Sequence, residues 1–544
     1  MEMHFATIWE HVTDLMGDHT ALIHGNDKRS WREYDDRAAR VAGALTERGF
    51  GVDTKVGMYM YNCNEYLEVQ YAAFKMRGSP INVNYRYMNN ELLYLLENAD
   101  VEVVFYHACF ADRISAIKDQ LPDVKLYVQV GDGSETPLLE GSIDYEQLIA
   151  DSEPMPRITR DEKDIYMLYT GGTTGMPKGV MYEMHELCRG LLMGFELSGI
   201  APPESPEAII EEVVKLKAAG ANPVSLVGCP LMHGTGVWLG AMAMMHMGGT
   251  VVTVPNRRLD CHAIWNAVQT HGVNNIIIVG DAFAKPMIKA LDEAVSDGKP
   301  YDLSSIRMIA SSGVMWTTEV KRKLLEHVDT MLIDVLGATE GSMGKSITTR
   351  ANIATTAKFM INDTSKVFND DWQEVKPGSG EIGRVANGSF SPVGYYKDPK
   401  KSAGTFVVVE GHRYSIPGDF ATVEADGSIS LLGRGSMCIN TKGEKVFPEE
   451  VEEAIKKNPA VYDCLVAGVK DPDFGERITA LVSIADNAAV SAEAIIAALE
   501  GEISGYKKPR NVFIVDEVKR AVNGKADYRW AKDTAAERFA GLAG

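Results

Sequence analysis

The sequence lacks the features of several large classes of protein. Its seven cysteines are scattered, without the CxxC or CxxxC spacing of a zinc site or the density of a disulfide framework, so we expect reduced thiols. The most apolar stretch, residues 240–255, is interrupted by His246 and by glycines and is too short to cross a bilayer. The opening residues, MEMHFATIWEHVTDLMGDH, have no basic start followed by an unbroken apolar segment, which argues against a signal peptide. Together these absences predict a cytoplasmic protein without an integral membrane segment.

Positive charge is also scarce. The chain has 55 lysines and arginines against 75 aspartates and glutamates, a formal net charge of −20 at pH 7. Because such a field repels polyanions, nucleic acid and anionic membranes are poor candidates for partners, and a phosphate ligand must be held by local donors. With 544 residues, of which 45% are hydrophobic and 24% charged, the chain is expected to form a large folded body and at least one further domain.

Short β-rich runs alternate with helix-like segments between about Asp164 and Gly337. The pairs are DIYMLY and YEMHELCRGLLMGFEL, NNIIIVG and AKPMIKALDEAV, and IRMIAS and TTEVKRKLLEHV, followed by MLIDVLG. This alternation predicts α/β units with ligand-binding loops at the carboxyl ends of the strands. The glycine-rich stretch YTGGTTGMPKG (169–179) follows the first of these strands.

A second pattern follows further along the chain. FATVEADGSISLL predicts two strands joined by a two-residue turn at Asp426-Gly427, which places Ala425 opposite Ser428 and, in the same register, Asp419 opposite Arg434. After Arg434 the strand-like and helix-like segments suffice for a separate α+β domain of roughly a hundred residues. We therefore predict two domains, 1–434 and 435–544, with a boundary near Gly435-Ser436.

The glycine-rich stretch has the composition of an anion-binding loop. Consecutive glycines let successive backbone N–H groups converge, the threonine hydroxyls add donors, and Lys178 adds a positive charge. A P-loop is one alternative, but it requires glycine before the lysine and serine or threonine after it, where this chain has Pro177 and Gly179. An ordinary surface loop is the other alternative, and the neighbouring motifs decide against it.

Those motifs resemble the adenylate-forming enzymes, which comprise acyl-CoA synthetases, aryl-CoA ligases, luciferases and the adenylation domains of peptide synthetases. TGGTTGMPKG fits the family's phosphate loop, and the other motifs follow in order: LGATEG (336–341), EIGRV (381–385), GYYKDP (394–399), YSIPGDF (414–420), LLGRGSMCINTKGEKVFPEEVEEAI (431–455) and AVNGKADYR (521–529). The resemblance covers nearly the whole chain. It implies an α/β fold with a large N-terminal body of several subdomains and a smaller, mobile α+β C-terminal domain.

The resemblance also implies two half-reactions. A carboxylate attacks the α-phosphate of ATP to give an acyl-adenylate and pyrophosphate, and a thiol, usually that of coenzyme A, then displaces AMP. Because both steps develop charge on oxygen, preorganised donors, cations and Mg²⁺ are needed. By position, the β- and γ-phosphates would be held by Thr170, Gly172, Thr173, Thr174, Gly175 and Lys178.

Other positions follow from the resemblance in the same way. Thr339 would contact the α-phosphate and Glu340 would bind Mg²⁺. From the residues alone, Thr-Glu after a strand is also typical of a capped helix N-terminus, which would suit phosphate. Asp419 would accept hydrogen bonds from the ribose hydroxyls, and Arg434 would reach the ribose or phosphate. The remaining nucleotide-binding positions are Gly313, Val314, Met315, Asp334, Leu336, Gly337 and Ala338.

The last group of expected site residues serves the acyl transfer. Lys525 follows the turn signal Asn523-Gly524 and would reach the reacting carboxylate and the α-phosphate. His233 would border the acyl pocket, although a lone histidine among apolar residues is more often part of a core. Rotation about a hinge at Gly435-Ser436 would bring Gly443 forward, where it lets the pantetheine arm pass close to the backbone.

Four residues depart from the family pattern: Gly171, Leu336, Pro417 and Ser436. None removes a charged catalytic group, so we expect activity. The acid pocket would be formed by the apolar, small-residue segments PLMHGTGVW, IIIVGDAF, ASSGVMW and DVLGATE, which favour a hydrophobic acid because each buried CH₂ contributes about 0.8 kcal/mol. The motifs are similar to those of bacterial acyl-CoA synthetases that act on bulky acids such as steroid side chains.

Several alternatives stay open at this point. A carrier protein or an amine could be the acceptor, and a luciferase-like oxygenase shares every motif. An amino-acid adenylation domain would need an aspartate that His233-Gly-Thr-Gly236 does not offer. A catalytically silent nucleotide-binding protein is disfavoured because the charged positions of the motifs are retained. A homodimer is compatible with the sequence.

Overall fold

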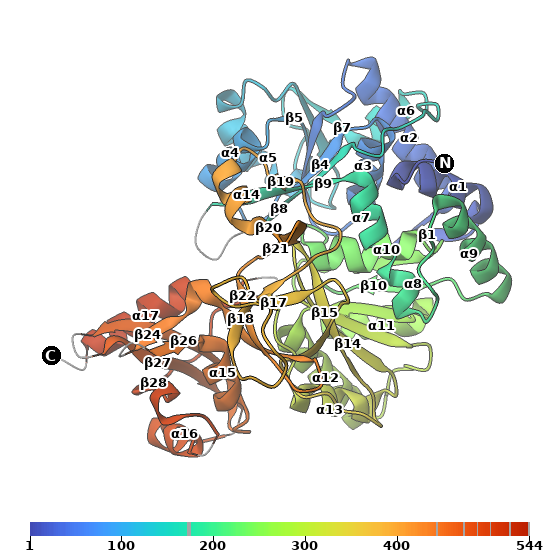
Figure 1. The fold of residues 1–544 in the computed structure, drawn as a ribbon. Coiled ribbons are helices and arrows are strands. Elements are labelled where there is room, and N and C mark those ends of the chain that lie inside the picture. Colours follow the sequence, from blue (N-terminus) through green and yellow to red (C-terminus); the bar gives the residue numbers. More distant parts are fainter. Residues whose placement is uncertain are drawn as a thin grey trace.

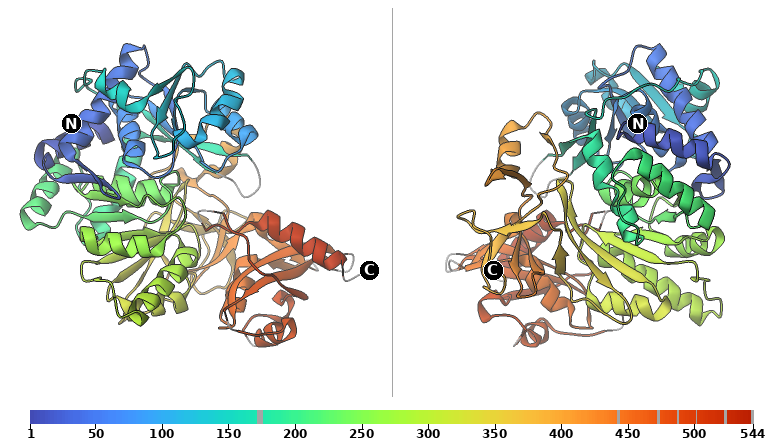
Figure 2. Two further views of the ribbon diagram at one scale, coloured as in Figure 1. Left: turned by 180° about the vertical axis from the view of Figure 1, so that it is seen from behind. Right: turned by 45° about the vertical axis from the view of Figure 1, so that its right-hand side comes forward.

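The structure is a computed structural model that describes residues 1–170, 176–441, 444–471, 474–486, 488–500, 502–521 and 524–541, without the side chains of Ser436 and Lys445. The N-terminal helix α1 (Phe5–Met16) and the last helix α17 (Tyr528–Ala540) lie on opposite sides of the molecule (Figures 1 and 2). Three regions succeed one another between them: an N-terminal parallel sheet, a large central sheet and a small C-terminal sheet.

The N-terminal region is a parallel sheet between helices. The order of its strands is β4-β3-β5-β6-β7, with β3 at Lys55–Tyr59, β4 at Ser79–Asn82, β5 at Val101–His107, β6 at Leu126–Val130 and β7 at Ser142–Asp144. Its helices are α2 (Trp31–Glu47), α3 (Asn64–Lys75), α4 (Asn89–Asn98), α5 (Ala111–Ile117) and α6 (Tyr145–Ala150), with 3₁₀ turns at Ala108–Phe110 and Lys118–Gln120. Because β3 and β4 are buried along their whole length, this sheet is a core layer, as is usual for parallel sheets.

The central sheet combines a parallel half with an antiparallel half. In the described part of the chain it has 13 strands in the order β17-β18-β22-β23-β16-β15-β14-β13-β12-β10-β11-β1-β2. The parallel half comprises β1 (Thr20–His24), β10 (Val224–Val227), β11 (Thr250–Thr253), β12 (Asn275–Ile278), β13 (Met308–Ser312) and β14 (Met331–Ala338), with β2 (Asp27–Ser30) antiparallel at the edge. The antiparallel half comprises β15 (Gly341–Thr348), β16 (Lys358–Ile361), β17 (Lys366–Phe368), β18 (Ile382–Ala386), β22 (Asp419–Val423) and β23 (Ile429–Arg434).

The helices of the central region confirm the predicted strand and helix alternation. They are α7 (Met184–Gly190), α8 (Met193–Leu197), α9 (Pro206–Ala219), the π-helix η3 (Thr235–Met242), α10 (Ala243–Met245), α11 (Cys261–His271), α12 (Gly280–Ser296) and α13 (Thr318–His327). The strand β12, NIII, is buried at every position, which explains why the sequence shows a continuous apolar run rather than alternation. The carboxyl ends of the parallel strands lead into loops that contain several of the predicted site residues, such as Gly313 and Thr339.

The glycine-rich stretch is the exception to this alternation. It connects β8 (Ile165–Thr170) to β9 (Lys178–Glu183), which pair antiparallel in a separate small sheet with β19 (Gly394–Tyr395). The expected helix over YEMHELCRGLLMGFEL is therefore wrong at its start, where Tyr182 and Glu183 belong to β9. The helix α14 (Pro399–Thr405) follows β19, and the next two strands, β20 (Phe406–Val409) and β21 (His412–Ser415), pair antiparallel with each other (Figure 1).

The C-terminal region confirms the predicted α+β composition. Its strands β24 (Ile439–Thr441), β25 (Glu444–Val446), β26 (Val461–Asp471), β27 (Gly475–Ile484) and β28 (Asn511–Ile514) form one sheet. The helices α15 (Pro448–Lys456) and α16 (Ala492–Ala498) and the helix α17 pack on it through two apolar clusters. A 3₁₀ turn at Gly435–Met437 separates β23 from β24, another lies at Gly505–Lys507, and the division into two domains at this point stays a prediction.

None of the helices in the described ranges has both the length and the hydrophobicity needed to span a bilayer.

Candidate active site

A cavity of about 680 Å³ lies where the carboxyl ends of the central strands meet the C-terminal region. Its walls come from β8, η3, β13, β14, β15, the helices α7 and α8, and Lys525 of the C-terminal region. Of the predicted site residues it brings together Thr170, His233, Gly313, Gly337, Ala338, Thr339 and Lys525.

The described ends of the phosphate loop belong to two paired strands, β8 and β9. Thr170 ends β8 and is paired with Lys178, the first residue of β9. The four predicted phosphate ligands between them, Gly172, Thr173, Thr174 and Gly175, lie outside the described residues. Lys178 donates a hydrogen bond from Nζ to Asp398 Oδ2 at 2.7 Å, so in this structure a carboxylate holds the expected phosphate-binding cation.

The turn that carries Thr339 and Glu340 joins two antiparallel strands. The predicted helix N-terminus at this position is wrong, because β14 continues to Ala338 and β15 begins at Gly341. Glu340 is only 9% exposed, and its Oε1 accepts a hydrogen bond of 2.6 Å from Tyr395 Oη. The backbone oxygen of Thr339 accepts one of 3.1 Å from Tyr182 Oη, so two tyrosines on the neighbouring strands β9 and β19 hold the turn.

The predicted nucleotide residues on β14 fall into two sets, and the register of the strand shifts between them, at Leu336 and Gly337. Gly337 and Ala338 line the cavity, whereas Asp334 and Leu336 do not belong to its lining. Asp334 is buried against Lys321 at 3.2 Å, and burial raises its pKa to about 6 in spite of that lysine. Leu336 packs in an apolar cluster with Met343 and Phe359, and its contact with adenine stays a prediction.

The adenine-loop residues are also only partly in the cavity. Gly313 lines it with a φ of +90°, a conformation that favours glycine. Val314 and Met315 direct their backbone oxygens toward Gly280, where Asp281 N donates to Met315 O at 3.1 Å. Their side chains are not part of the lining, so any contact of these two residues with a ligand in this cavity would be made by the backbone.

Asp419 and Arg434 lie side by side as predicted, but by a different route. Glu424 and not Ala425 faces Ser428, so the hairpin loop has one residue more than the predicted two-residue turn. A bulge between Phe420 and Ala421 compensates and restores the pairing of Asp419 with Arg434. Arg434 Nε donates to Asp419 Oδ1 at 3.2 Å. Within the described residues Asp419 Oδ2 is buried without a hydrogen-bond partner, which suits an acceptor for a ligand hydroxyl.

His233 and Lys525 approach each other across the cavity. Burial, together with the positive charge of Lys525, lowers the pKa of His233 to about 3, so its imidazole is neutral at pH 7. The side chain of Lys525 lines the cavity. Removal of its ammonium from bulk water and the positive charge of Arg434 lower its pKa, while the negative charges of Glu340 and Asp419 act in the opposite direction. These charges identify one electrostatic site that spans both regions of the chain.

The loop that presents Lys525 is held firmly. Arg520 forms an ion pair with Asp463 at 2.6 Å and donates to the backbone oxygen of Gly524 at 3.2 Å. Gly524 has a φ of +72°, and a Cβ there would lie 2.8 Å from the Cβ of Ala282 at the start of α12. The loop therefore rests directly on α12, and glycine is required for that contact.

Three contributors were missed in the sequence. Tyr395 and Asp398 belong to the recognised GYYKDP motif, but nothing local indicated that they contact Glu340 and Lys178. Asn82, at the end of β4, connects β8 to the segment before His233. Its side chain accepts a hydrogen bond from Tyr169 N at 2.6 Å and donates one to Met232 O at 2.7 Å. The predicted pantetheine contact Gly443 lies outside the described residues.

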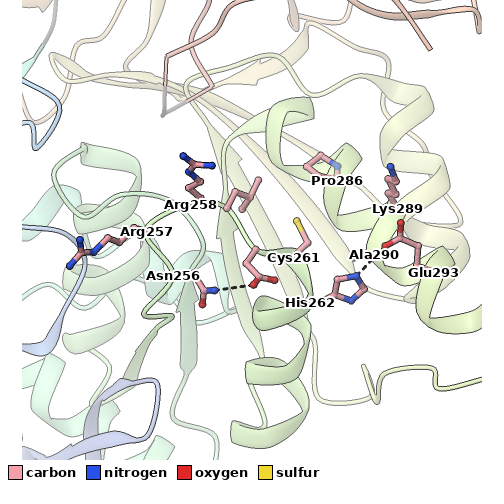
Figure 3. Close-up of a pocket in the computed structure, with 11 residues that line it drawn as sticks. Asn256, Arg257, Arg258, Cys261, His262, Pro286, Lys289, Ala290 and Glu293 are labelled. Carbon is pink, nitrogen blue, oxygen red and sulfur yellow. Dashed lines mark hydrogen bonds and ion pairs between the residues drawn. The ribbon is translucent and has the colours of Figure 1, made fainter. Parts of the chain in front are cut away.

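A second, open hollow of about 610 Å³ lies between α11 and α12 (Figure 3). Its polar side chains pair locally: Asn256 with Asp260 at 2.9 Å and His262 with Glu293 at 3.1 Å. Arg257 turns to Asp132, 2.9 Å away. Because these groups satisfy one another, the hollow is a weaker candidate for a binding site than the cavity.

Comparison with known proteins identifies the family of the chain. A family model described as AMP-binding enzyme matches residues 9–389, and one described as AMP-binding enzyme C-terminal domain matches residues 450–525. The chain is 39% identical over 548 residues to the "Medium/long-chain-fatty-acid--CoA/3-oxocholest-4-en-26-oate--CoA ligase" of Mycolicibacterium smegmatis, with 99% of this chain and 97% of that protein covered. It is 39% identical over 546 residues to the "3-oxocholest-4-en-26-oate--CoA ligase" of Rhodococcus rhodochrous, with 98% and 96% covered.

Among solved structures, the fold is similar to that of the anthranilate CoA ligase AuaEII in complex with anthranoyl-AMP. The TM-score is 0.84 at 20% identity, and the match covers 99% of this chain and 98% of the other. At this identity the likeness concerns the fold. The first family model and the full-length relatives together establish the ancestry, and the resemblance to the adenylate-forming enzymes is confirmed. The chain belongs to the AMP-binding enzyme family.

Proposed function

We propose that the protein is an ATP-dependent acyl-CoA ligase that adenylates a hydrophobic carboxylic acid and transfers the acyl group to coenzyme A. The observation that carries the proposal is the position of Lys525, whose side chain lines a largely apolar cavity together with Thr170, Gly313 and Thr339. A cation placed between an apolar pocket and phosphate-binding turns suits a reaction that joins a carboxylate to a phosphate.

In the first half-reaction a carboxylate oxygen bonds to the α-phosphorus of ATP, and the bond to the bridging oxygen breaks as pyrophosphate leaves. The ammonium of Lys525 reduces the repulsion between the two anions as they approach. The hydroxyl of Thr339 donates to the α-phosphate, and Lys178 with the glycine-rich stretch takes the charge of the leaving pyrophosphate. Asp419 and Arg434 hold the ribose, the former through the oxygen that lacks a partner in the described part of the chain.

Glu340 fits the metal that this reaction needs. No group of three or more histidine, cysteine or acidic side chains in the described residues could hold a metal ion by itself. Mg²⁺ characteristically binds through one or two carboxylates and completes its shell with water and substrate phosphates, so a single oriented carboxylate is sufficient. When bound, the ion neutralises phosphate charge. Tyr395 keeps the Glu340 carboxylate in place for it.

The acid is proposed to be bulky, long-chain or polycyclic. The cavity volume of about 680 Å³ lies within the roughly 300–1,000 Å³ of small-molecule sites. Its apolar lining includes Leu168, Leu187, Leu191, Trp238, Leu239, Val335, Met360 and Phe390. The relatives named for fatty acids and for a steroid acid, which match the chain from end to end, support the same class of substrate.

The second half-reaction requires a different arrangement. The thiol of coenzyme A attacks the acyl carbonyl carbon and AMP leaves with its phosphate oxygen. While Lys525 occupies the cavity, it stands where the first step takes place, so we propose that the chain beyond Gly435-Ser436 rotates between the steps. Gly443, which lies outside the described residues, would then border the pantetheine arm. The proposal places this reaction in the cytoplasm.

The test measures pyrophosphate release across fatty, aryl, branched and polycyclic acids, with and without coenzyme A. Release with acid and ATP alone identifies adenylation, and thioester formation identifies coenzyme A as the acceptor. An adenylate that passes instead to an amine, a carrier protein or oxygen would correct the acceptor.

The variant Lys525→Ala should lower pyrophosphate release by at least about a hundredfold, the usual cost of removing one transition-state donor, with ATP binding preserved. Lys519→Ala, which removes an exposed lysine of the same region, is the control. Equal release by Lys525→Ala and wild type would overturn the role of Lys525. No release with any acid by the wild type would overturn the function.

A further inference from the structure

Lys178 and Asp398 form the contact from which the inference starts. Their 2.7 Å ion pair joins the first residue of β9 to the residue that caps α14. The side chains are 36% and 33% exposed, so water and a ligand reach both of them. Asp398 divides its oxygens between two tasks: Oδ1 accepts from the backbone N–H of Lys401 at 2.9 Å, while Oδ2 binds Lys178.

The backbone positions Asp398 independently of this ion pair. In the small sheet, β19 runs antiparallel to β9, with Tyr395 opposite Val180, and Tyr396 N donates to Gly179 O at 2.8 Å. On the other side of the segment, Asp100 accepts hydrogen bonds from Tyr396 and Lys397 at 2.7 and 2.6 Å. Asp398 is therefore attached to the strand that begins with Lys178, and the pair would still face each other if the ion pair were broken.

Phosphate oxygens would compete with the Asp398 carboxylate for the ammonium of Lys178. The function proposed above, on which this step rests, gives Lys178 to the terminal phosphates of ATP. A phosphate oxygen that binds Lys178 must displace Asp398 Oδ2 or share the ammonium with it, and either arrangement brings a carboxylate close to a polyanion. Like charges about 4 Å apart in water repel by about 1 kcal/mol, which corresponds to about fivefold in a binding constant.

We propose that Asp398 is a positioning residue that holds Lys178 before ATP arrives and takes it back when pyrophosphate leaves. Its carboxylate keeps the ammonium ordered at the start of β9, and its charge lowers the affinity for the departing anion. The residue thus favours release of pyrophosphate over retention. The bond changes of the reaction are not altered.

The variant Asp398→Asn tests this directly. Asparagine caps helices as well as aspartate does and is nearly isosteric, so the start of α14 should persist while the charge is lost. Titration calorimetry with inorganic pyrophosphate and Mg²⁺ should show about fivefold tighter binding than the wild type. In turnover, pyrophosphate should inhibit at a correspondingly lower concentration. Asp371→Asn, which removes one charge from an exposed site elsewhere, is the control and should bind pyrophosphate as the wild type does.

A double-mutant cycle separates a charge effect on Lys178 from a structural effect. Lys178→Met should weaken pyrophosphate binding, and Asp398→Asn should no longer strengthen it in that background. The inference is overturned if Asp398→Asn binds pyrophosphate as the wild type does or more weakly, or if it strengthens binding equally without Lys178. If the wild type binds neither ATP nor pyrophosphate, the proposed function fails first, and the inference with it.

Discussion

Replacement of Gly524 by alanine should selectively impair the first half-reaction. The added Cβ would lie 2.8 Å from the Cβ of Ala282, whereas ordinary contacts begin at 3.4 Å, so the loop must move by a sizeable fraction of an ångström. The φ of +72° adds about 1–2 kcal/mol of strain for any residue with a Cβ. Both costs fall on the loop that positions the neighbouring Lys525.

The expected loss of activity follows from that displacement. A misplacement of about 1 Å at a reacting group can cost about a hundredfold in rate, so Gly524→Ala should release pyrophosphate about tenfold to a hundredfold more slowly. Thioester formation from preformed acyl-adenylate and coenzyme A should change little, because the loop is proposed to leave the cavity before that step. Stopped-flow measurements of the two half-reactions give both rates.

Two further variants make the reasoning refutable. Gly505→Ala, in the same region, adds a Cβ that meets none of the described residues within 4 Å at a position without a positive φ, and should behave as the wild type. Ala282→Gly removes the opposing methyl group, so in the Gly524→Ala background it should restore part of the rate. Wild-type adenylation by Gly524→Ala, or no recovery in the double variant, would contradict the steric explanation.

Two other predictions concern buried hydroxyl and carboxyl groups. Tyr395→Phe removes the hydrogen bond to Glu340, worth about 1.5–3 kcal/mol for a charged acceptor, and should weaken Mg²⁺-dependent ATP binding in calorimetry about tenfold or more. Tyr506→Phe, at an exposed tyrosine of the C-terminal region, is the control, and unchanged binding by Tyr395→Phe would be contrary evidence. Burial and the neighbouring Glu452 raise the pKa of Glu449 to about 8 from the ordinary value of 4.5, so the folded protein holds a proton that the unfolded chain releases. Stability should therefore fall as pH rises from about 4.5 to about 8, and Glu449→Gln should lessen this fall in thermal melts by an amount on the order of a few kcal/mol; parallel curves would argue otherwise.

The parts of the fold that are determined locally were predicted well. Apolar runs and helical periodicity predicted the strands β12, β13 and β14 and the helices α12 and α13, because these patterns lie within each element. In the C-terminal region the same patterns indicated the strands β26, β27 and β28 and the helix α16. The order of strands in the central sheet could not be read, because it joins segments as distant as β1 and β11.

Seven of the predicted site residues line one cavity, but the local geometry around them was predicted less well. Thr339-Glu340 was expected to start a helix, but pairing of β14 with β15 makes it a hairpin turn, and that pairing depends on contacts beyond the local sequence. The same strand directs Leu336 and Asp334 away from the cavity, which a motif alone does not reveal. Tyr395 contacts its partner across 55 positions of chain, a distance over which no local spacing rule applies.

The two offsets in the β22–β23 hairpin have a consequence for how the chain can vary. The additional residue in the turn shifts the pairing of the two strands by one position, and the bulge between Phe420 and Ala421 shifts it back. The length of the turn therefore affects which way the Asp419 side chain points. Because side chains alternate with a period of two, the loss of one of these offsets without the other would turn that carboxylate to the opposite face of the strand. Insertions and deletions in this hairpin should therefore be tolerated only in compensating pairs, even though Asp426 and Gly427 in the turn do not line the cavity.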